Sequence, residues 1–319
     1  MKRQRFGSTN EEVSSMVQGC LRIAPRDWGG DPNSDSVKSA FEGLDTALEC
    51  GIDVFDHADI YGGGRCEELF GHWLAAHRNL REKIFIQTKC GVRPGVYDFS
   101  GRHIQSSVDA SLKRLQIEQI DCILLHRPDV LMQVQEVGNA FDQLHAAGKV
   151  RYFGVSNHHA GLLELLRAGL SQPIVANQVE LSLIHTGILD AGPDWNARDT
   201  QMPPDPTFSY CHQHHITIQA WSPVVGGLLT GRACPADNPR AEQVAVAWPV
   251  IQELAKEKEV SVEAVVIGWL LHHPAQIQPI FGTVNPDRIR ASCQATDVSF
   301  SREQWYRLYV AGRGGRSMP

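Results

Sequence analysis

Short apolar runs alternate with amphipathic segments along almost the whole chain. The runs that predict strands lie at 16–18, 52–55, 84–88, 122–125, 152–155, 174–176, 216–220 and 278–281. In the segments 37–48 and 134–144 apolar residues recur every three or four positions, and Gly51 or Gly148 follows, as is typical of a helix that ends at a glycine. Strands that alternate with helices predict a parallel sheet, and this number of strands favours a closed (β/α)8 TIM barrel over a doubly wound sheet.

Two segments interrupt this alternation. Residues 187–206 are rich in Pro, Gly and Asp and predict a long loop after the sixth strand, and residues 91–101 predict a shorter loop after the third. Both follow strand carboxyl ends, where a (β/α)8 barrel keeps its active site. Ser301 and Gln304 predict a capping box that starts a final helix. Because no repeat or change in composition marks a boundary, we expect a single domain over residues 1–319.

The composition is that of an ordinary globular protein, with 42% hydrophobic and 21% charged residues. A formal net charge of −6 favours neither nucleic acid nor an anionic membrane surface as a partner. No apolar segment follows the basic start, and the longest apolar run, 264–271, is too short to cross a bilayer. The eight scattered cysteines are typical of a reduced protein, so we expect a cytoplasmic location. Nothing in the sequence predicts the oligomeric state.

Polar or amphipathic side chains follow six successive predicted strands, at the point where each strand ends. They are Asp56, Lys89, His126, Ser156, Asn157, Gln178, Trp221 and Ser222. Each alone is explained by the return of the chain to water at a strand end, and a buried Asp–Lys pair is often only a satisfied ion pair. In a closed barrel, however, all of them converge on one mouth, so together they predict an active site there.

Tyr61 adds a proton donor to this set. It opens a turn with three glycines, 62–64, which allow the backbone to fold tightly. A free tyrosine has a pKa of about 10, and a nearby Lys89 ammonium is expected to lower it while Asp56 holds the lysine in position. His126 can orient a carbonyl oxygen beside Tyr61. The set is suited to reducing a carbonyl group, with the hydride supplied by a nicotinamide because no side chain can supply one.

Several motifs occur in the right order for one known family. They are DHADIYGGG (56–64), TKCG (88–91), LLHRPD (124–129), GKVRYFGVSN (148–157), NQVE (177–180), AWSPVVGG (220–227) and FGTVNPDRIRAS (281–292). With these motifs the chain resembles the aldo-keto reductase superfamily over nearly its full length. The resemblance implies a catalytic tetrad of Asp56, Tyr61, Lys89 and His126, and an enzyme that reduces a small aldehyde or ketone to an alcohol.

The resemblance also implies where a nicotinamide cofactor binds. Trp221 would stack on the nicotinamide ring, and Ser156, Asn157 and Gln178 would bond its carboxamide. The pyrophosphate would lie against Ser222, Pro223, Val224 and Gly226. The adenosine 2′-phosphate would lie against Thr283, Asn285 and Arg288. No GxGxxG follows a strand, so a Rossmann site is not expected.

The sequence departs from the family pattern near the 2′-phosphate. Gly282 stands where many relatives have a basic residue, and Ala291 and Ser292 replace a Glu and an Asn near the adenine. Arg288 still offers a charge-assisted fork for a phosphate. We therefore expect NADPH (NADP+) as the cofactor, with NADH as the alternative.

The substrate is expected to contact His126 and the loops after the first, third and sixth strands. Leu21 stands where relatives carry Trp, and Trp28 follows it; Val92, Tyr97 and 183–206 are further candidates. These side chains favour a small carbonyl compound with an apolar body. His158 and His159 are expected at the surface where a helix starts, and Cys90 as a packing residue. The histidines beside Cys211 fit no zinc spacing, so no metal is expected.

Two other functions are compatible with parts of this pattern. Some relatives with this barrel are NADPH-binding regulatory subunits of potassium channels with little turnover, a reading that rests on the fold alone. A lyase that forms a Schiff base at Lys89 would leave Tyr61 and Trp221 without a role.

Overall fold

The computed structural model describes residues 1–25, 34–77, 79–194 and 205–318. Its centre is a closed barrel of eight strands in the order β10-β11-β12-β3-β4-β5-β8-β9. All neighbouring pairs are parallel. The strands are β3 (Val17–Gly19), β4 (Val54–Asp56), β5 (Phe85–Cys90), β8 (Ile120–Leu125), β9 (Val150–Ser156), β10 (Ile174–Glu180), β11 (Thr217–Trp221) and β12 (Gln278–Phe281). The predicted (β/α)8 barrel is confirmed, and each predicted strand overlaps one of these.

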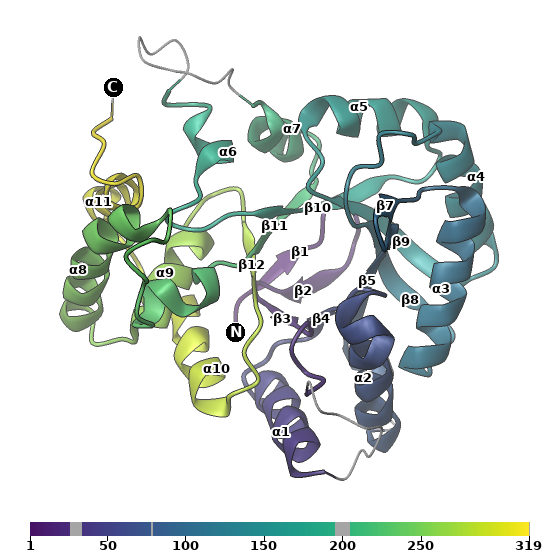
Figure 1. Ribbon diagram of the computed structural model, residues 1–319, viewed down its shortest axis with the longest axis horizontal. Coiled ribbons are helices and arrows are strands. Elements are labelled where there is room, and N and C mark those ends of the chain that lie inside the picture. Colours follow the sequence, from purple (N-terminus) through teal and green to yellow (C-terminus); the bar gives the residue numbers. More distant parts are fainter. Residues whose placement is uncertain (26–33, 78, 195–204, 319) are drawn as a thin grey trace.

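Helices surround the barrel (Figure 1). The strands are followed by α1 (Asp35–Glu49), α2 (Arg65–Ala76), α3 (Gly101–Leu115), α4 (Val134–Ala146), α5 (Ala160–Gly169), α7 (Thr207–Gln213), α8 (Ala241–Glu257), α9 (Val262–Leu271) and α10 (Pro286–Cys293). The last helix, α11 (Arg302–Gly312), packs on α8, and the predicted capping box between Ser301 and Gln304 is present. The apolar run 264–271 lies in α9, which is buried. Within the described part of the chain, no helix is long and apolar enough to span a bilayer.

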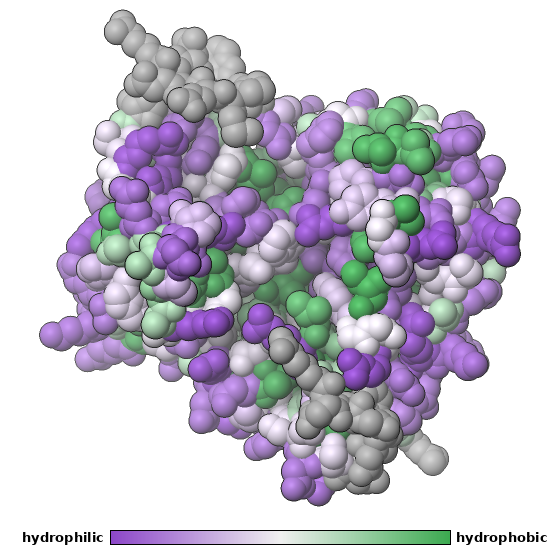
Figure 2. Space-filling view, viewed as in Figure 1, coloured by the Kyte–Doolittle hydropathy of each residue, from purple (hydrophilic) through white to green (hydrophobic). Residues whose placement is uncertain are grey.

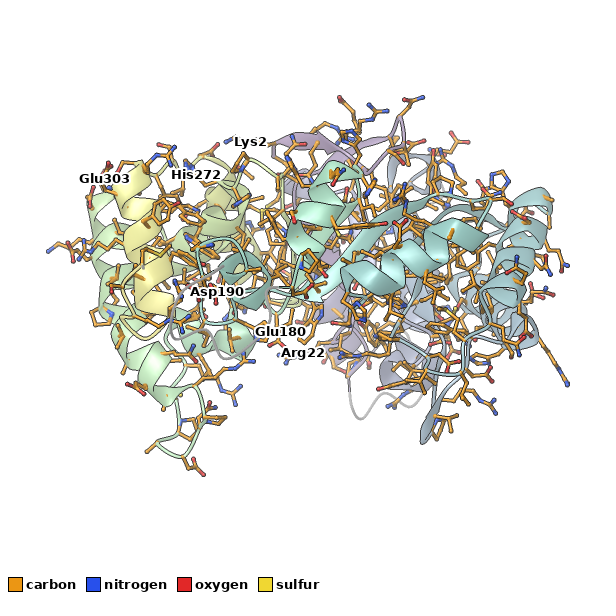
Figure 3. All side chains as sticks on the ribbon, turned by 90° about the horizontal axis from the view of Figure 1, so that it is seen from above. Lys2, Arg22, Glu180, Asp190, His272 and Glu303 are labelled. Carbon is orange, nitrogen blue, oxygen red and sulfur yellow. The ribbon has the colours of Figure 1, made fainter. Side chains whose placement is uncertain are left out.

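An amino-terminal hairpin, which the sequence analysis does not predict, covers one end of the barrel. Strands β1 (Arg3–Arg5) and β2 (Glu12–Ser14) pair antiparallel. Phe6 and Val13 pack in one apolar cluster with residues at the starts of the barrel strands, such as Val17 and Val54. Gly7 has φ +58, and a Cβ there would come within 2.2 Å of the carbonyl oxygen of Val175. Figure 3 shows Lys2 at this end and Arg22 and Glu180 at the opposite mouth.

Both predicted loops contain regular structure, so these two predictions were incomplete. The segment after β10 forms a short helix, α6 (Gly187–Asp190), before residues 195–204, which lie outside the described part. The segment after β5 forms the antiparallel pair β6 (Val92–Arg93) and β7 (Val96–Tyr97) before α3. The remaining elements in the described part of the chain are the 3-10 turns η1 (Tyr61–Gly64), η2 (Arg81–Lys83), η3 (Val225–Thr230) and η4 (Gln294–Thr296).

Glutamine side chains cross the interior of the barrel. Gln219 Nε2 donates to Gln87 Oε1 and to Gln278 Oε1, both at 2.8 Å, and Gln278 Nε2 donates to the carbonyl oxygen of Ser14 at 2.7 Å. Gln87 Nε2 in turn donates to Asp56 Oδ1 at 2.5 Å. These buried amides satisfy one another, as buried polar groups must. The network connects Ser14, at the end of the amino-terminal hairpin, to Asp56 at the mouth of the barrel.

Candidate active site

Lys89 lies at the centre of a buried polar cluster. Its Nζ donates to Asp56 Oδ1 at 2.8 Å, to Asp56 Oδ2 at 2.7 Å and to the carbonyl oxygen of His57 at 2.8 Å. It also lies 3.1 Å from the hydroxyl oxygen of Tyr61. The lysine side chain is 0% exposed. The structure therefore brings together three of the four residues predicted for the tetrad.

Strand ends and one glycine turn position these side chains. Asp56 is the last residue of β4, and Lys89 is the next-to-last residue of the neighbouring strand β5. Tyr61 begins η1, in which Gly62 has φ +59 and Gly63 has φ +68. Glycine adopts this left-handed backbone at little steric cost. The turn places the Tyr61 ring over the lysine, with Nζ 4.9 Å from the ring centroid.

The charge states follow from burial and from the ion pair. Burial opposes a charge on Lys89, but Asp56 and Tyr61 together outweigh it and the pKa of the lysine is raised. Burial also raises the pKa of Tyr61, and the Lys89 charge offsets this only in part. The expected lowering by Lys89 is present, but burial outweighs it, so the net direction of the tyrosine pKa is the opposite of the one expected. A lysine held as an ammonium is a poor nucleophile, which argues against the Schiff-base lyase.

His126 is the fourth member and follows β8. Its ring lies edge-on to Tyr61, with the centroids 6.0 Å apart and the planes at 79°. Its Nδ1 is buried, and no described residue bonds it. Burial, together with the charges of Lys89 and Arg127, lowers the pKa of His126 to about 3. The imidazole is therefore neutral near pH 7 and keeps one N–H as a donor.

Asp56 is held by two amides in addition to the lysine. Gln178 Nε2 donates to Asp56 Oδ1 at 2.9 Å, and Gln87 donates to the same oxygen. Gln178 was predicted to bond the carboxamide of the cofactor, and in the structure its amide donates to Asp56 instead. Gln87 was missed, although it stands two residues before Lys89 and so shares a face of β5 with it. That spacing is the signal that could have found it.

A cavity of about 570 Å³ runs from Tyr61 and His126 to Arg288. Its wall includes every predicted cofactor residue: Ser156, Asn157, Gln178, Trp221, Ser222, Pro223, Val224, Gly226, Thr283, Asn285 and Arg288. Leu21, a predicted substrate contact, also lines it and is 51% exposed. Figure 2 shows a hollow near the centre of the face seen, with apolar residues inside it. Trp28 lies outside the described residues. Val92 and Tyr97 do not line the cavity.

Hydrogen bonds hold the middle of the cavity wall in place. Trp221 Nε1 donates to Asn157 Oδ1 at 3.1 Å, and Asn157 Nδ2 donates to Ser156 Oγ at 2.8 Å. Ser156 Oγ donates to the carbonyl oxygen of Gln178 at 2.9 Å. Asn157 and the neighbouring Ser222 have φ +60 and +56, a left-handed backbone that is uncommon for residues other than glycine. Such strain is often found at functional sites. Trp221 therefore presents a fixed aromatic surface to the cavity.

The far end of the cavity has a different character. Asn285 caps α10: its Oδ1 accepts from the Arg288 backbone N at 3.0 Å. The Arg288 side chain is exposed and makes no hydrogen bond or ion pair with a described residue. Glu263, from the first turn of α9, lines the same end and was not predicted. Gly282, where many relatives have a basic residue, provides no cation, although a side chain there would have open space around it.

His158 is buried, and this corrects the prediction of a surface residue. Its Nδ1 donates to the carbonyl oxygen of Ser156 at 2.9 Å, and its ring stacks on Phe99 with the centroids 6.1 Å apart. His159, three residues after the end of β9 at Ser156, is exposed as predicted and caps α5: its ring nitrogen accepts from the Gly161 N at 3.1 Å. Cys90 is buried as a packing residue.

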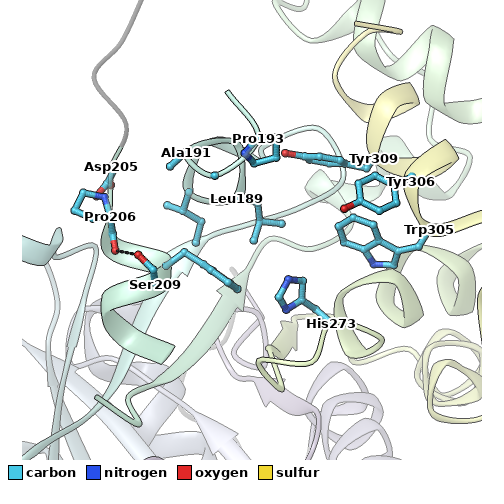
Figure 4. A pocket seen from close by; sticks show the side chains of 13 residues that line it. Leu189, Ala191, Pro193, Asp205, Pro206, Ser209, His273, Trp305, Tyr306 and Tyr309 are labelled. Atoms are coloured by element: carbon cyan, nitrogen blue, oxygen red, sulfur yellow. Dashed lines mark hydrogen bonds between the residues drawn. The ribbon is translucent and has the colours of Figure 1, made fainter. Parts of the chain in front are cut away.

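A second cavity of about 490 Å³ lies between α6, α7 and α11 (Figure 4). Its wall is largely aromatic and includes Phe208, Trp305, Tyr306 and Tyr309, with His273 beside them. It shares no lining residue with the cavity above the tetrad. The predicted cofactor residues line the first cavity and not this one. Of the predicted substrate segment 183–206, seven residues line this second cavity and none lines the first: Ile188, Leu189, Ala191, Gly192, Pro193, Asp205 and Pro206.

The chain matches the model of the aldo/keto reductase family over residues 26–310. It is 35% identical to a 6-dehydroglucose reductase of Agrobacterium fabrum over 313 residues, which cover 95% of each chain. It is 34% identical to the oxidoreductase YdhF of Escherichia coli over 322 residues, which cover 98% of each chain.

Solved structures agree with this. The thermostable aldo-keto reductase Tm1743 superposes with a TM-score of 0.76 at 26% identity, over 98% of this chain and 100% of that one. The glycerol dehydrogenase AKR11B4 of Gluconobacter oxydans, at 23% identity and a TM-score of 0.81 over 99% and 97%, shares the fold. The resemblance in the motifs is confirmed. The chain belongs to the aldo/keto reductase family, and it is an oxidoreductase that acts on small carbonyl compounds.

Proposed function

We propose that this enzyme reduces an aldehyde or ketone to an alcohol with NADPH and that Tyr61 is the proton donor. The observation that carries the proposal is the contact of Lys89 Nζ with both Asp56 and the Tyr61 hydroxyl at the base of the cavity. A phenol beside a buried ammonium is suited to giving up its proton when an alkoxide forms above it, because the cation stabilises the tyrosinate that remains.

Each residue of the tetrad then has one task. Tyr61 gives its proton to the carbonyl oxygen, and Lys89 stabilises the phenolate. Asp56, fixed by Gln87 and Gln178, keeps the lysine charged and in place. The neutral His126 donates a hydrogen bond to the same carbonyl oxygen and orients it.

The cavity residues fit a nicotinamide dinucleotide. Trp221 offers an aromatic face beside the tetrad, and the amides of Asn157 and Gln178 lie next to it. When bound, the nicotinamide supplies the hydride that no side chain can supply. The turn at Gly226 (φ +63) and Gly227 (φ +96) can bring backbone close to a pyrophosphate. Arg288, in the first turn of α10, offers a cation near a helix amino terminus, where phosphates bind well.

The preference for NADPH over NADH rests on one cation. Arg288 favours the 2′-phosphate, whereas Glu263 at the same end of the cavity disfavours a second negative charge. Both side chains are at least partly exposed, so solvent weakens both effects. We infer that NADPH binds more tightly than NADH, and that the difference in affinity is smaller than a buried phosphate site would give.

The proposal is tested by replacing Tyr61 with Phe. We expect kcat to fall about 10²–10⁴-fold, since a positioned general acid contributes that much, while the Kd for NADPH changes little. NADPH fluorescence titration measures binding, and NADPH oxidation with a panel of small aldehydes, hydroxylated ones included, measures turnover. Tyr306→Phe, in the second cavity, is the matched control and should retain wild-type activity.

The outcomes separate the alternatives. Binding in both proteins with turnover only in the wild type supports the proposal. Full activity in Tyr61→Phe contradicts the assignment of the proton donor. Tight binding without turnover of any aldehyde or ketone supports the regulatory subunit, and no binding of either cofactor contradicts the cofactor assignment.

A further inference from the structure

Arg127 is a cation in the substrate end of the cavity to which the proposed reaction gives no role. It directly follows His126 at the end of β8 and is half-buried. It lines the cavity above the tetrad and also a shallow neighbouring pocket that contains His158 and Glu180. Its guanidinium carbon lies 5.7 Å from the centroid of the Trp221 ring. The side chain therefore stands at the aromatic wall beside the tetrad.

Among the described residues, Arg127 has no hydrogen-bond or ion-pair partner. The carboxylates around it are occupied. Glu180 accepts from Arg240 at 2.9 Å, and Asp205 accepts from the Thr207 backbone N at 3.0 Å and from its hydroxyl at 2.5 Å. A half-buried guanidinium with five donors is costly to leave unpaired, so its position favours an anion that arrives with a ligand.

The electrostatics of this end of the cavity point the same way. The charge of Asp56 is matched by Lys89, and His126 is neutral near pH 7. Arg22, which is exposed, adds a second cation to the same wall. The charge of Arg127 is felt at the reacting position, because it contributes to the lowered pKa of His126 after burial and Lys89. The substrate end therefore carries net positive charge among the described residues.

We propose that Arg127 binds a carboxylate on the substrate, so that the enzyme prefers carbonyl compounds that carry a carboxylate a few atoms from the reacting carbon. This rests on the proposed carbonyl reduction. The planar fork of arginine matches a carboxylate with two parallel hydrogen bonds, which fixes orientation as well as adding affinity. Leu21 and Trp221 accommodate the apolar carbons between the two groups.

The test compares substrates of equal length with and without the anion. Succinate semialdehyde and butanal are reduced with NADPH by the wild type and by Arg127→Met. In the wild type we expect kcat/KM to favour succinate semialdehyde at least tenfold. In Arg127→Met this ratio should fall to near one, since a charge-assisted bidentate pair is lost. Arg127→Lys, which keeps the charge but not the fork, should lie between them.

Arg102→Met is the matched control because Arg102 is exposed on α3 and does not line the cavity. It changes net charge equally and should leave the ratio at the wild-type value. A ratio unchanged in Arg127→Met overturns the proposal. So does an equal loss with both aldehydes accompanied by weaker NADPH binding, which would mean that Arg127 positions the cofactor through Trp221. A preference for glyceraldehyde over both of these aldehydes, lost in Arg127→Met, would instead mean that Arg127 donates hydrogen bonds to substrate hydroxyl groups. That result would also overturn the proposal.

A binding measurement keeps this result separate from the proposed reaction. If the wild type reduces neither aldehyde, the carbonyl-reduction proposal fails for these compounds. Arg127 is then judged by titrating 4-hydroxybutanoate and butan-1-ol into protein saturated with NADP+, following tryptophan fluorescence. Binding of 4-hydroxybutanoate alone, weakened at least tenfold in Arg127→Met, supports the carboxylate site, whereas equal binding to both proteins overturns it.

Discussion

The two ends of the long cavity are built in opposite ways. At the tetrad, Asp56 and Lys89 are buried at strand ends, and each of their polar atoms is bonded. At the far end, Arg288 and Glu263 stand on the first turns of helices, partly or fully exposed, without partners among the described residues. Proton transfer needs fixed geometry, which burial in a barrel provides. A charged phosphate can be bound by exposed side chains. Their interactions are weaker than those of buried groups, and replacing them disturbs the fold less.

The comparison predicts that damage at the buried end is severe. Lys89→Met leaves the Asp56 carboxylate buried without its cation, which costs about 3–5 kcal/mol when one partner of such a pair is removed. We expect this loss in urea unfolding, together with loss of carbonyl reduction. The double variant Asp56→Asn with Lys89→Met removes both charges and should regain most of the stability but none of the activity. Single and double variants of equal stability would mean that the pair is not a coupled unit.

The effect at the exposed end should be smaller and specific to one cofactor. Arg288→Ala removes the cation proposed for the 2′-phosphate, and we expect the Kd for NADPH to rise about tenfold, the lower range for a charge-assisted bond because the site is exposed. The Kd for NADH should change less than twofold. Fluorescence titration with both cofactors measures this. Equal losses would place the 2′-phosphate elsewhere in the cavity.

Glu263 should have the smallest effect, with the opposite sign. Glu263→Gln removes a negative charge from the end of the cavity that holds Arg288, so NADPH should bind about threefold more tightly, since exposed charges interact weakly. The gain should shrink in high salt, because ions screen it. Weaker binding of both cofactors in Glu263→Gln would instead make the carboxylate a partner of the adenine or a ribose hydroxyl.

Local patterns in the chain were sufficient to predict the barrel and the convergence of Asp56, Lys89 and His126 at its mouth. Each strand is a short apolar run, and parallel strands in a barrel end at the same mouth, so Asp56, Lys89 and His126 had to converge whatever the details of packing. The capping box at Ser301 depends on residues only three apart and was equally predictable. The amino-terminal hairpin was missed because its strands are only three residues long and largely polar.

Only the tertiary structure decided what each side chain meets across the barrel. The glutamine network joins residues up to 264 positions apart, which no local pattern encodes. The raised pKa of Tyr61 depends on burial that outweighs the Lys89 charge. Glu263 and Arg127 look like surface charges in the sequence, and the folded chain places both on the wall of the cavity. Spacing along the chain determines which face a residue occupies, whereas burial and charge depend on segments brought together from far apart.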